Sequence, residues 1–410
     1  MPKRKRFKDS EVIQEKIGKM PMLQKRCPCC SSEAIDVIFT IENAPIFSLV
    51  AVKTKEQALA VPRKTIELGF CNGCGFIFNR LFDTSIDYFS MGYEDQQGFS
   101  KTFMQFLTRI SKGLIERYDL FGKTILEIGC GKGDFLNLFV GLNQGNGIGI
   151  DPACESSRQN NANITFYKES YAHRHGEIQA DLICCRHTFE HIHNTSEFLS
   201  VIRKSLARQI GPVIFFEVPQ IKRILQIRAF WDIYYEHCSY FSPGALARVF
   251  RRTGFEVLDL RLDYDDQYLL LEARPCLNES TETFEIEESV AQLKEMVEDF
   301  SKKIREELGE WRRKLAELKT KKAKTVVWGG GSKSVGFLVN FADLNLIEYV
   351  VDVNPHMEGN FIPGIGSMYV QPSFLKEYRP DAVIIMNGIY RNEITQSLNS
   401  MDLRPEIHAL

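Results

Sequence analysis

The chain has 410 residues, of which 44% are hydrophobic and 25% charged, and its formal net charge is −2. This length suffices for two or three domains with their own cores. The near-neutral charge excludes a global electrostatic attraction to nucleic acid or to an anionic membrane. No apolar run is long enough to span a bilayer, and the N-terminal residues lack the apolar region typical of a signal peptide. We therefore expect a cytoplasmic protein whose eleven cysteines are reduced.

Two Cys-x-x-Cys pairs stand in the first hundred residues: Cys27 with Cys30, and Cys71 with Cys74. Two such pairs supply four thiolates from two tight turns, which suits a structural, tetrahedral zinc ion. Four sulfur ligands alone do not exclude iron, and Cys29 offers a spare thiol. The alternative interpretation is four unconnected reduced thiols. We expect residues 1–98 to form a small zinc-binding domain.

The most informative run is ILEIGCGKGDF at residues 125–135. An apolar strand leads into three glycines at alternate positions and then into an amphipathic helix. Such a turn lets backbone N–H groups approach a polar or anionic ligand with no Cβ in the way. A second apolar strand ends in Asp151, whose carboxylate suits a ribose diol. The alternative is a glycine-rich turn that holds no ligand.

Alternating strands and helices continue to about residue 275, which predicts an α/β fold with a doubly wound parallel sheet over residues 99–275. Ligands of such sheets bind at the carboxyl ends of the strands. The candidate cofactor-binding residues therefore lie at strand ends and in the glycine turn. One of them, His187, has no assigned chemical role. They are Glu127, Gly129, Cys130, Gly131, Gly133, Phe135, Asp151 and His187.

Residues 276–323 are rich in Glu and Lys, and their apolar residues recur every three or four positions, which predicts one long amphipathic helix. We expect this helix either to pack between domains or to form the contact surface of a dimer, so the sequence is compatible with a monomer and with a homodimer. The strand and glycine-turn pattern then restarts, with a second strand ending in Asp352. We expect residues 324–410 to form a smaller Rossmann-like unit, either a scaffold or a second cofactor or phosphate site.

Two segments that follow strands concentrate the residue types of proton transfer, residues 185–193 and residues 231–242. A histidine near neutral pKa can remove a proton from a substrate, and a carboxylate can fix its tautomer. Tyrosine hydroxyls can donate to a developing oxyanion. His237 is the strongest candidate base. The alternative for any one of these histidines is a hydrogen-bonded structural residue.

The E-x-G-x-G-x-G form resembles the first motif of class I S-adenosylmethionine-dependent methyltransferases. The whole order of features resembles the sugar C-methyltransferases of deoxysugar and antibiotic biosynthesis. The most specific marks are the E-H-x-x-Y-F-S run that starts at Glu236 and the D-x-N-P-H run that starts at Asp352. The resemblance covers nearly the whole chain, from about residue 27 to residue 397.

The resemblance implies a methyltransferase core that binds S-adenosylmethionine, between an N-terminal zinc domain and a C-terminal Rossmann-like domain. It also implies a nucleotide-linked keto-deoxysugar as substrate, and a histidine base that abstracts the proton beside the ketone. The resemblance places the catalytic residues at His237, Tyr234, Glu236, His191 and Tyr93.

The chain departs from the sugar enzymes at residues 264–268, where the sequence YDDQY replaces a His-Gly-Gly turn. Because Asp263, Asp265 and Asp266 are nearby, the sequence is also compatible with a polar substrate that carries a positive charge. The leading hypothesis is C-methylation of a small molecule. The alternatives are O- or N-methylation of a natural-product intermediate, and a zinc-containing assembly protein with a vestigial methyltransferase core. Basic residues between Cys30 and Cys71 are few and scattered, which argues against a nucleic-acid partner.

Overall fold

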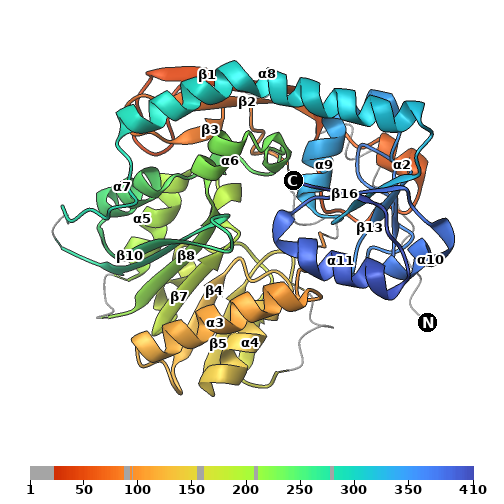
Figure 1. The fold of residues 1–410 in the computed structure, drawn as a ribbon. Coiled ribbons are helices and arrows are strands. Elements are labelled where there is room, and N and C mark those ends of the chain that lie inside the picture. The colour runs from red at the N-terminus through yellow and green to blue at the C-terminus, as the bar shows by residue number, and fades with distance from the viewer. Residues whose placement is uncertain (1–22, 87–92, 95, 155–160, 207–210, 278–280) are drawn as a thin grey trace, which may run out of the picture.

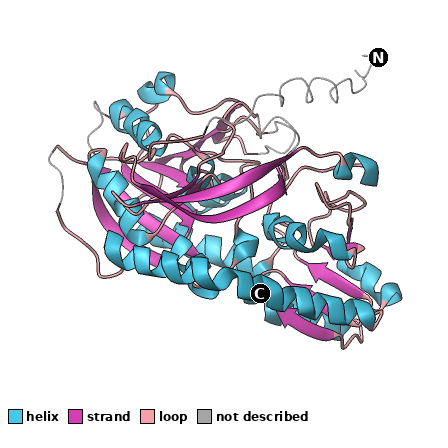
Figure 2. Ribbon diagram, turned by 90° about the horizontal axis from the view of Figure 1, so that it is seen from above, coloured by secondary structure: helices cyan, strands magenta, loops and turns pink. Residues whose placement is uncertain are grey.

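The computed structural model describes residues 23–86, 93–94, 96–154, 161–206, 211–277 and 281–410. Three β-sheets organise this part of the chain, and one long helix runs across all three regions (Figure 1). Viewed from above, the C-terminal sheet and its helices lie to one side of the other two sheets (Figure 2). Among the described residues, no helix is both long and apolar enough to cross a bilayer.

The first sheet is antiparallel, with strand order β1-β2-β3-β9. Its last strand, β9, comes from a segment more than 150 residues further along the chain and pairs Tyr240 with Ile77 of β3. The sheet therefore fixes the backbone beside the E-H-x-x-Y-F-S run. The elements of this region are β1 (Ile35–Pro45), α2 (Lys55–Leu59), β2 (Arg63–Cys71), β3 (Ile77–Asn79) and β9 (Ser239–Tyr240).

The second sheet has seven strands in the order β10-β11-β8-β7-β4-β5-β6. Strands β4 to β8 are parallel and β11 is antiparallel to both of its neighbours. The central strands β4, β7 and β8 are almost entirely buried and apolar, which is typical of a sheet covered on both faces. The strands are β4 (Thr124–Ile128), β5 (Asn146–Ile150), β6 (Ile164–Tyr167), β7 (Leu182–Arg186), β8 (Val213–Pro219), β10 (Phe255–Asp263) and β11 (Tyr268–Pro275).

Helices and short 3₁₀ turns connect these strands, and the strand order reverses between β4 and β7. That reversal opens a crevice at the carboxyl ends of the two strands. The connecting elements are α3 (Lys101–Arg117), α4 (Asp134–Asn143), η2 (His173–Glu177), η3 (Phe189–His191), α5 (Thr195–Ser205), α6 (Ile221–Ile227), η4 (Phe230–Asp232) and α7 (Pro243–Arg252).

The third sheet is fully parallel, with strand order β14-β13-β12-β15-β16, and its order reverses between β12 and β15. The prediction of an α/β fold with a second Rossmann-like unit is therefore confirmed. Its elements are β12 (Thr325–Trp328), α9 (Ser332–Leu338), η5 (Val339–Leu344), β13 (Tyr349–Val351), β14 (Met368–Val370), η6 (Pro372–Phe374), α10 (Leu375–Tyr378), β15 (Ala382–Ile385), η7 (Gly388–Tyr390), α11 (Arg391–Ser400) and β16 (Glu406–Ala409).

The predicted long helix is α8 (Val290–Thr320), which begins with a capping box between Ser289 and Gln292. Its apolar stripe is covered within the chain. Phe300 meets Phe39 of β1 with ring centroids 5.7 Å apart, and Trp311 meets Phe337 of α9 at 5.1 Å. The helix thus packs between domains, which was one of the two interpretations of its sequence. Its buried stripe is therefore not available as the contact surface of a dimer, the other interpretation.

Candidate functional site

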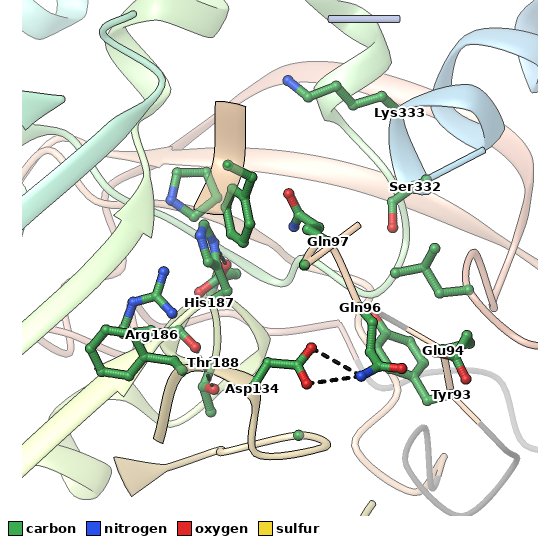
Figure 3. A pocket seen from close by; sticks show the side chains of 18 of the residues that line it. Tyr93, Glu94, Gln96, Gln97, Asp134, Arg186, His187, Thr188, Ser332 and Lys333 are labelled. Atoms are coloured by element: carbon green, nitrogen blue, oxygen red, sulfur yellow. Dashed lines mark hydrogen bonds and ion pairs between the residues drawn. The ribbon is translucent and has the colours of Figure 1, made fainter. Parts of the chain in front are cut away.

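The carboxyl ends of the parallel strands in the second and third sheets face a shared cavity of about 560 Å³. One wall comes from the glycine turn after β4 and from the segment after β7. The opposite wall comes from the turn after β12, which carries Ser332 and Lys333 (Figure 3). A cavity of this volume is within the range of small-molecule and cofactor sites. The fold therefore joins both predicted Rossmann-type turns in one site.

The first glycine turn has the backbone conformation that its sequence predicts. Gly129, Gly131 and Gly133 all have positive φ, at 75°, 52° and 87°. A side chain at position 129 would also collide with Thr188, so glycine is required there for space as well as for conformation. The turn leads directly into α4, beside Phe135, whose ring lies under the guanidinium of Arg186 at 4.3 Å.

Asp151 stands at the tip of β5, where the sequence predicts it. Its two carboxylate oxygens accept backbone N–H groups from Gly131 at 2.8 Å and from Ala153 at 2.6 Å. Burial nevertheless raises the pKa of Asp151, because these bonds only partly offset desolvation. Each oxygen keeps a second lone pair, so the carboxylate can still accept hydroxyl groups from a ligand in the cavity.

Glu127, in β4 next to the first glycine turn, has a buried acceptor without a partner in the described part of the chain. The side chain is 3% exposed, and among the described residues its Oε2 atom has no hydrogen-bond partner. Burial raises the pKa of Glu127 to about 8, with Arg186 acting in the opposite direction. A buried carboxylate oxygen without a donor is costly, so this position is suited to a ligand that brings an ammonium or hydroxyl group.

The second glycine turn repeats the same local arrangement. Asp352, at the tip of β13, accepts the N–H of Gly330 at 2.7 Å and that of Asn354 at 2.7 Å. Its carboxylate therefore relates to its turn as Asp151 relates to the first turn. Both turns and both carboxylates line the cavity, which gives the C-terminal unit the geometry of a binding wall.

His237 and Tyr234 come together in the cavity. The tyrosine hydroxyl and the Nε2 atom of His237 share a hydrogen bond of 2.8 Å, and the ring of His191 lies 4.8 Å from that of His237. Burial lowers the pKa of His237 well below its usual value, and the neighbouring His191 and His187 lower it further. His237 is therefore neutral near pH 7 and able to accept a proton.

Of the two predicted catalytic residues Glu236 and Tyr93, only Tyr93 lines the cavity. Glu236 does not line the cavity. Its carboxylate accepts a hydrogen bond from the hydroxyl of Ser48, which also bonds to Ser332 at 2.8 Å. This chain of contacts joins all three regions of the protein. Its backbone carbonyl accepts Nδ1–H of His191 at 2.9 Å. The catalytic role of Glu236 stays a prediction. Tyr93 does line the cavity, near the first glycine turn (Figure 3).

A charged cluster after β7 was not anticipated from the sequence as a unit. Arg186 donates to both oxygens of Glu217 at 2.9 and 2.7 Å, and His187 Nε2 lies 2.8 Å from the same carboxylate. On its other side, His187 Nδ1 lies 3.4 Å from Glu190. Burial lowers the pKa of His187, but Glu190 and Glu217 outweigh burial and raise it to about 9. The run C-R-H-T-F-E-H just after a strand was the signal for this cluster.

The turn that departs from the sugar enzymes, at residues 264–268, docks the core onto the C-terminal unit. The Tyr264 hydroxyl donates to Tyr390 at 2.6 Å, and Gln267 exchanges hydrogen bonds of 2.9 Å with Asn387. The acidic side chains do not face the cavity: residues 265 and 266 are exposed, and Asp263 pairs with an arginine of α3. The structure therefore removes the support for a cationic substrate that these acids offered.

The four predicted thiols gather at one end of the first sheet. Sγ of Cys27 lies 3.6 Å from that of Cys74, and Sγ of Cys30 lies 3.5 Å from that of Cys71. Tetrahedral zinc with bonds of about 2.3 Å requires sulfurs about 3.8 Å apart, so the spacing fits a metal ion. The spare Cys29 is not in this group and lies 3.0 Å from the hydroxyl of Thr195.

Comparison with protein families gives two adjacent matches. A methyltransferase-domain family matches residues 99–260, and the C-methyltransferase C-terminal domain family matches residues 273–404. The chain carries a methyltransferase domain followed by a C-methyltransferase C-terminal domain. This combination confirms the resemblance to C-methyltransferases that the sequence indicates.

A curated relative, the C-methyltransferase NovU of Streptomyces niveus, is 31% identical over 167 residues, which are 38% of this chain and 39% of that protein. The chain thus aligns with about two fifths of that relative. Human N-acetylserotonin methyltransferase, solved with SAM, is 16% identical with a TM-score of 0.34, over 42% of this chain and 55% of that chain. A 1,6-didemethyltoxoflavin-N1-methyltransferase of Burkholderia thailandensis, solved with S-adenosylhomocysteine, is 15% identical with a TM-score of 0.32, over 42% and 78%.

Proposed function

We propose that this protein is an S-adenosylmethionine-dependent methyltransferase of small molecules, and that it methylates a carbon next to a carbonyl group. The favoured substrate is a nucleotide-linked keto-sugar or a related intermediate of secondary metabolism. One observation carries the proposal: a glycine turn with a strand-tip aspartate, a neutral histidine and a second such turn all open on the same cavity. The methyltransferase and C-methyltransferase domain matches support it.

The residues of the first turn fit S-adenosylmethionine. The unpartnered, buried Oε2 of Glu127 would accept the ammonium of its methionine part. Asp151 would accept its ribose hydroxyls, and the glycines leave room for the ligand against the backbone. When bound, this cofactor supplies an activated methyl group on a sulfonium.

Proton removal falls to His237. A proton next to a ketone is weakly acidic, so a base and a donor for the enolate oxygen must act together. His237 is neutral because of its burial, and Tyr234 lies within hydrogen-bond distance of its ring. Burial raises the pKa of Tyr234 well above its usual value, so its hydroxyl stays protonated as a donor. The hydrogen bond between them orients the two side chains, and alignment is the main requirement of the transfer step.

The C-terminal wall supports a nucleotide-linked substrate. Asp352 repeats the ribose-binding arrangement of Asp151. Arg223 lines the cavity and has no ion-pair partner among the described residues, and Lys333 lines it beside Asp232 at 2.6 Å. A guanidinium and an ammonium are suited to the oxygens of a diphosphate.

We propose zinc for the four-cysteine group, in a structural role. All four ligands come from the protein, so the ion would have no open position for chemistry. Its knuckles anchor β2 and β3, and β3 pairs with β9 just after His237. The ion would therefore hold the segment that carries the base.

The test uses the purified protein, S-adenosylmethionine and a panel of nucleotide-linked keto-sugars. In deuterium oxide without cofactor, we expect exchange of one carbon-bound proton in the wild type and in His193→Ala, but not in His237→Ala. With cofactor, we expect a new C–CH₃ group by NMR. Exchange that survives in His237→Ala, or a methyl group on oxygen or nitrogen, would overturn the proposed reaction.

A further inference from the structure

A carboxylate and two imidazoles meet in the wall of the cavity, apart from the cysteine group. The possible ligand atoms of Glu190, His191 and His237 all lie within 4.8 Å of one another. Glu190 is 2% exposed, and among the described residues its Oε2 atom has no hydrogen-bond partner although the side chain lines the cavity. A buried carboxylate oxygen without a donor, on a side chain that lines a cavity, indicates a missing positively polarised partner.

The surroundings of these ligands have the features that accompany metal binding. His191 donates Nδ1–H to the carbonyl of Glu236 at 2.9 Å. This bond fixes the tautomer, so the lone pair of the neutral ring is on Nε2. Histidines that bind metals commonly use their other nitrogen in this way. On the carboxylate side, His187 Nδ1 lies 3.4 Å from Glu190 Oε1 and orients it.

The spacing is close to that of a coordination shell. Bonds of about 2.05 Å in a tetrahedron place neighbouring nitrogen and oxygen ligands about 3.3 Å apart. Glu190 Oε1 and His237 Nε2 lie 3.9 Å apart, so the ligand atoms must move closer together to surround an ion. An ion on His237 Nε2 also displaces the Tyr234 hydroxyl, which bonds to that atom at 2.8 Å. Two histidines and one carboxylate with a remaining open position form the ligand class of zinc and non-haem iron sites.

We propose that Glu190, His191 and His237 form a second, exchangeable site for a divalent transition-metal ion of the zinc class. The site is separate in ligand type from the four cysteines, and it opens on the cavity. The positive groups near it, His187 and Arg186, are both paired with Glu217, which limits their repulsion of the ion.

One consequence rests on the proposed function. A metal ion at this site takes the lone pair of His237, so the ion and proton abstraction exclude each other. The binding site itself does not depend on the reaction, because it follows from the three ligands alone. Metal binding and methyl transfer are therefore tested separately.

The test is a titration of the untagged, full-length protein with Co²⁺ after its cysteine site has been filled with zinc and the excess removed. We expect one further equivalent, with visible d–d bands and no sulfur charge-transfer band. That equivalent is lost in Glu190→Gln and in His191→Ala, and kept in His193→Ala, a matched removal of an imidazole from the same loop. Equal zinc content and equal unfolding midpoints show that the variants are folded.

No further equivalent in the folded wild type would overturn the proposal, and so would an equivalent that survives in both ligand variants. With the ion bound, we expect loss of the His237-dependent exchange and unchanged affinity for S-adenosylmethionine. Absence of S-adenosylmethionine binding would defeat the proposed function and leave the metal stoichiometry unaffected, so the two failures are distinguishable.

Discussion

Glu127→Gln is expected to stabilise the cofactor-free protein and to weaken its binding of S-adenosylmethionine. The folded protein holds the pKa of Glu127 at about 8, above the ordinary value of 4.5, because the side chain is buried. The two values differ by about 3.5 pH units, and each unit corresponds to about 1.36 kcal/mol. The buried carboxyl group thus costs about 5 kcal/mol of the free energy of unfolding at pH 8 and above.

The sign follows from proton linkage. Between pH 4.5 and pH 8 the folded protein keeps the proton of Glu127 and the unfolded chain releases it, so stability falls as the pH rises through this window. The neutral amide of Glu127→Gln removes that loss. Its stability advantage is therefore near zero at pH 4.5 and largest above pH 8.

The assay is urea denaturation of the cofactor-free proteins at pH 5 and pH 8.5, with calorimetric titration of S-adenosylmethionine alongside. Glu256→Gln, which removes the carboxylate of a partly exposed ion pair with Arg274, is the control for the loss of one carboxylate elsewhere in the fold. Loss of one charge-assisted hydrogen bond of about 1.5–3 kcal/mol predicts a loss of affinity of about tenfold to a hundredfold in Glu127→Gln. A stability advantage that is equal at both pH values would refute the reasoning.

Three further predictions concern the base, the metal and the domain contact. His237→Ala loses methyl transfer with S-adenosylmethionine affinity unchanged, as measured by single-turnover product formation and calorimetry; near-normal turnover would disprove the assignment. Cys71→Ser loses bound zinc, as measured by elemental analysis, and lowers turnover by loosening the segment that carries His237; normal activity without zinc would contradict this. Tyr390→Phe removes the 2.6 Å hydrogen bond from Tyr264 and lowers the free energy of unfolding by about 0.5–1.5 kcal/mol; no change in urea denaturation would show that this contact is not stabilising.

Features encoded by local sequence were the ones predicted successfully. The glycines at alternate positions require positive φ, so the turn after β4 is readable from its residues. Each of the two Cys-x-x-Cys pairs likewise determines its own turn. The tertiary fold is needed only to bring the two turns together. The apolar period of α8 predicted a long helix, although the period alone did not say whether its stripe faces this chain or another.

Contacts between distant segments were the ones that sequence reasoning missed. Glu190 is three residues from His187, but Glu217 is 30 residues away, and only the parallel pairing of β7 with β8 brings its carboxylate to the same histidine. Glu236 is next to the base in sequence, but it does not line the cavity, and its carboxylate meets Ser48 from the segment after β1. The acids of residues 264–268 raised an expectation of positive substrate charge, because nothing in the sequence shows that the turn docks onto η7.

The most direct test of the account is calorimetric titration of S-adenosylmethionine into the wild type, Asp151→Ala and Asp352→Ala. The two aspartates make equivalent backbone contacts in the two glycine turns, so each variant controls for the structural effect of the other. We predict binding by the wild type and by Asp352→Ala, and its loss in Asp151→Ala. Absence of binding in the folded, zinc-loaded wild type, or equal binding by both variants, would contradict the assignment of the first turn as the cofactor site.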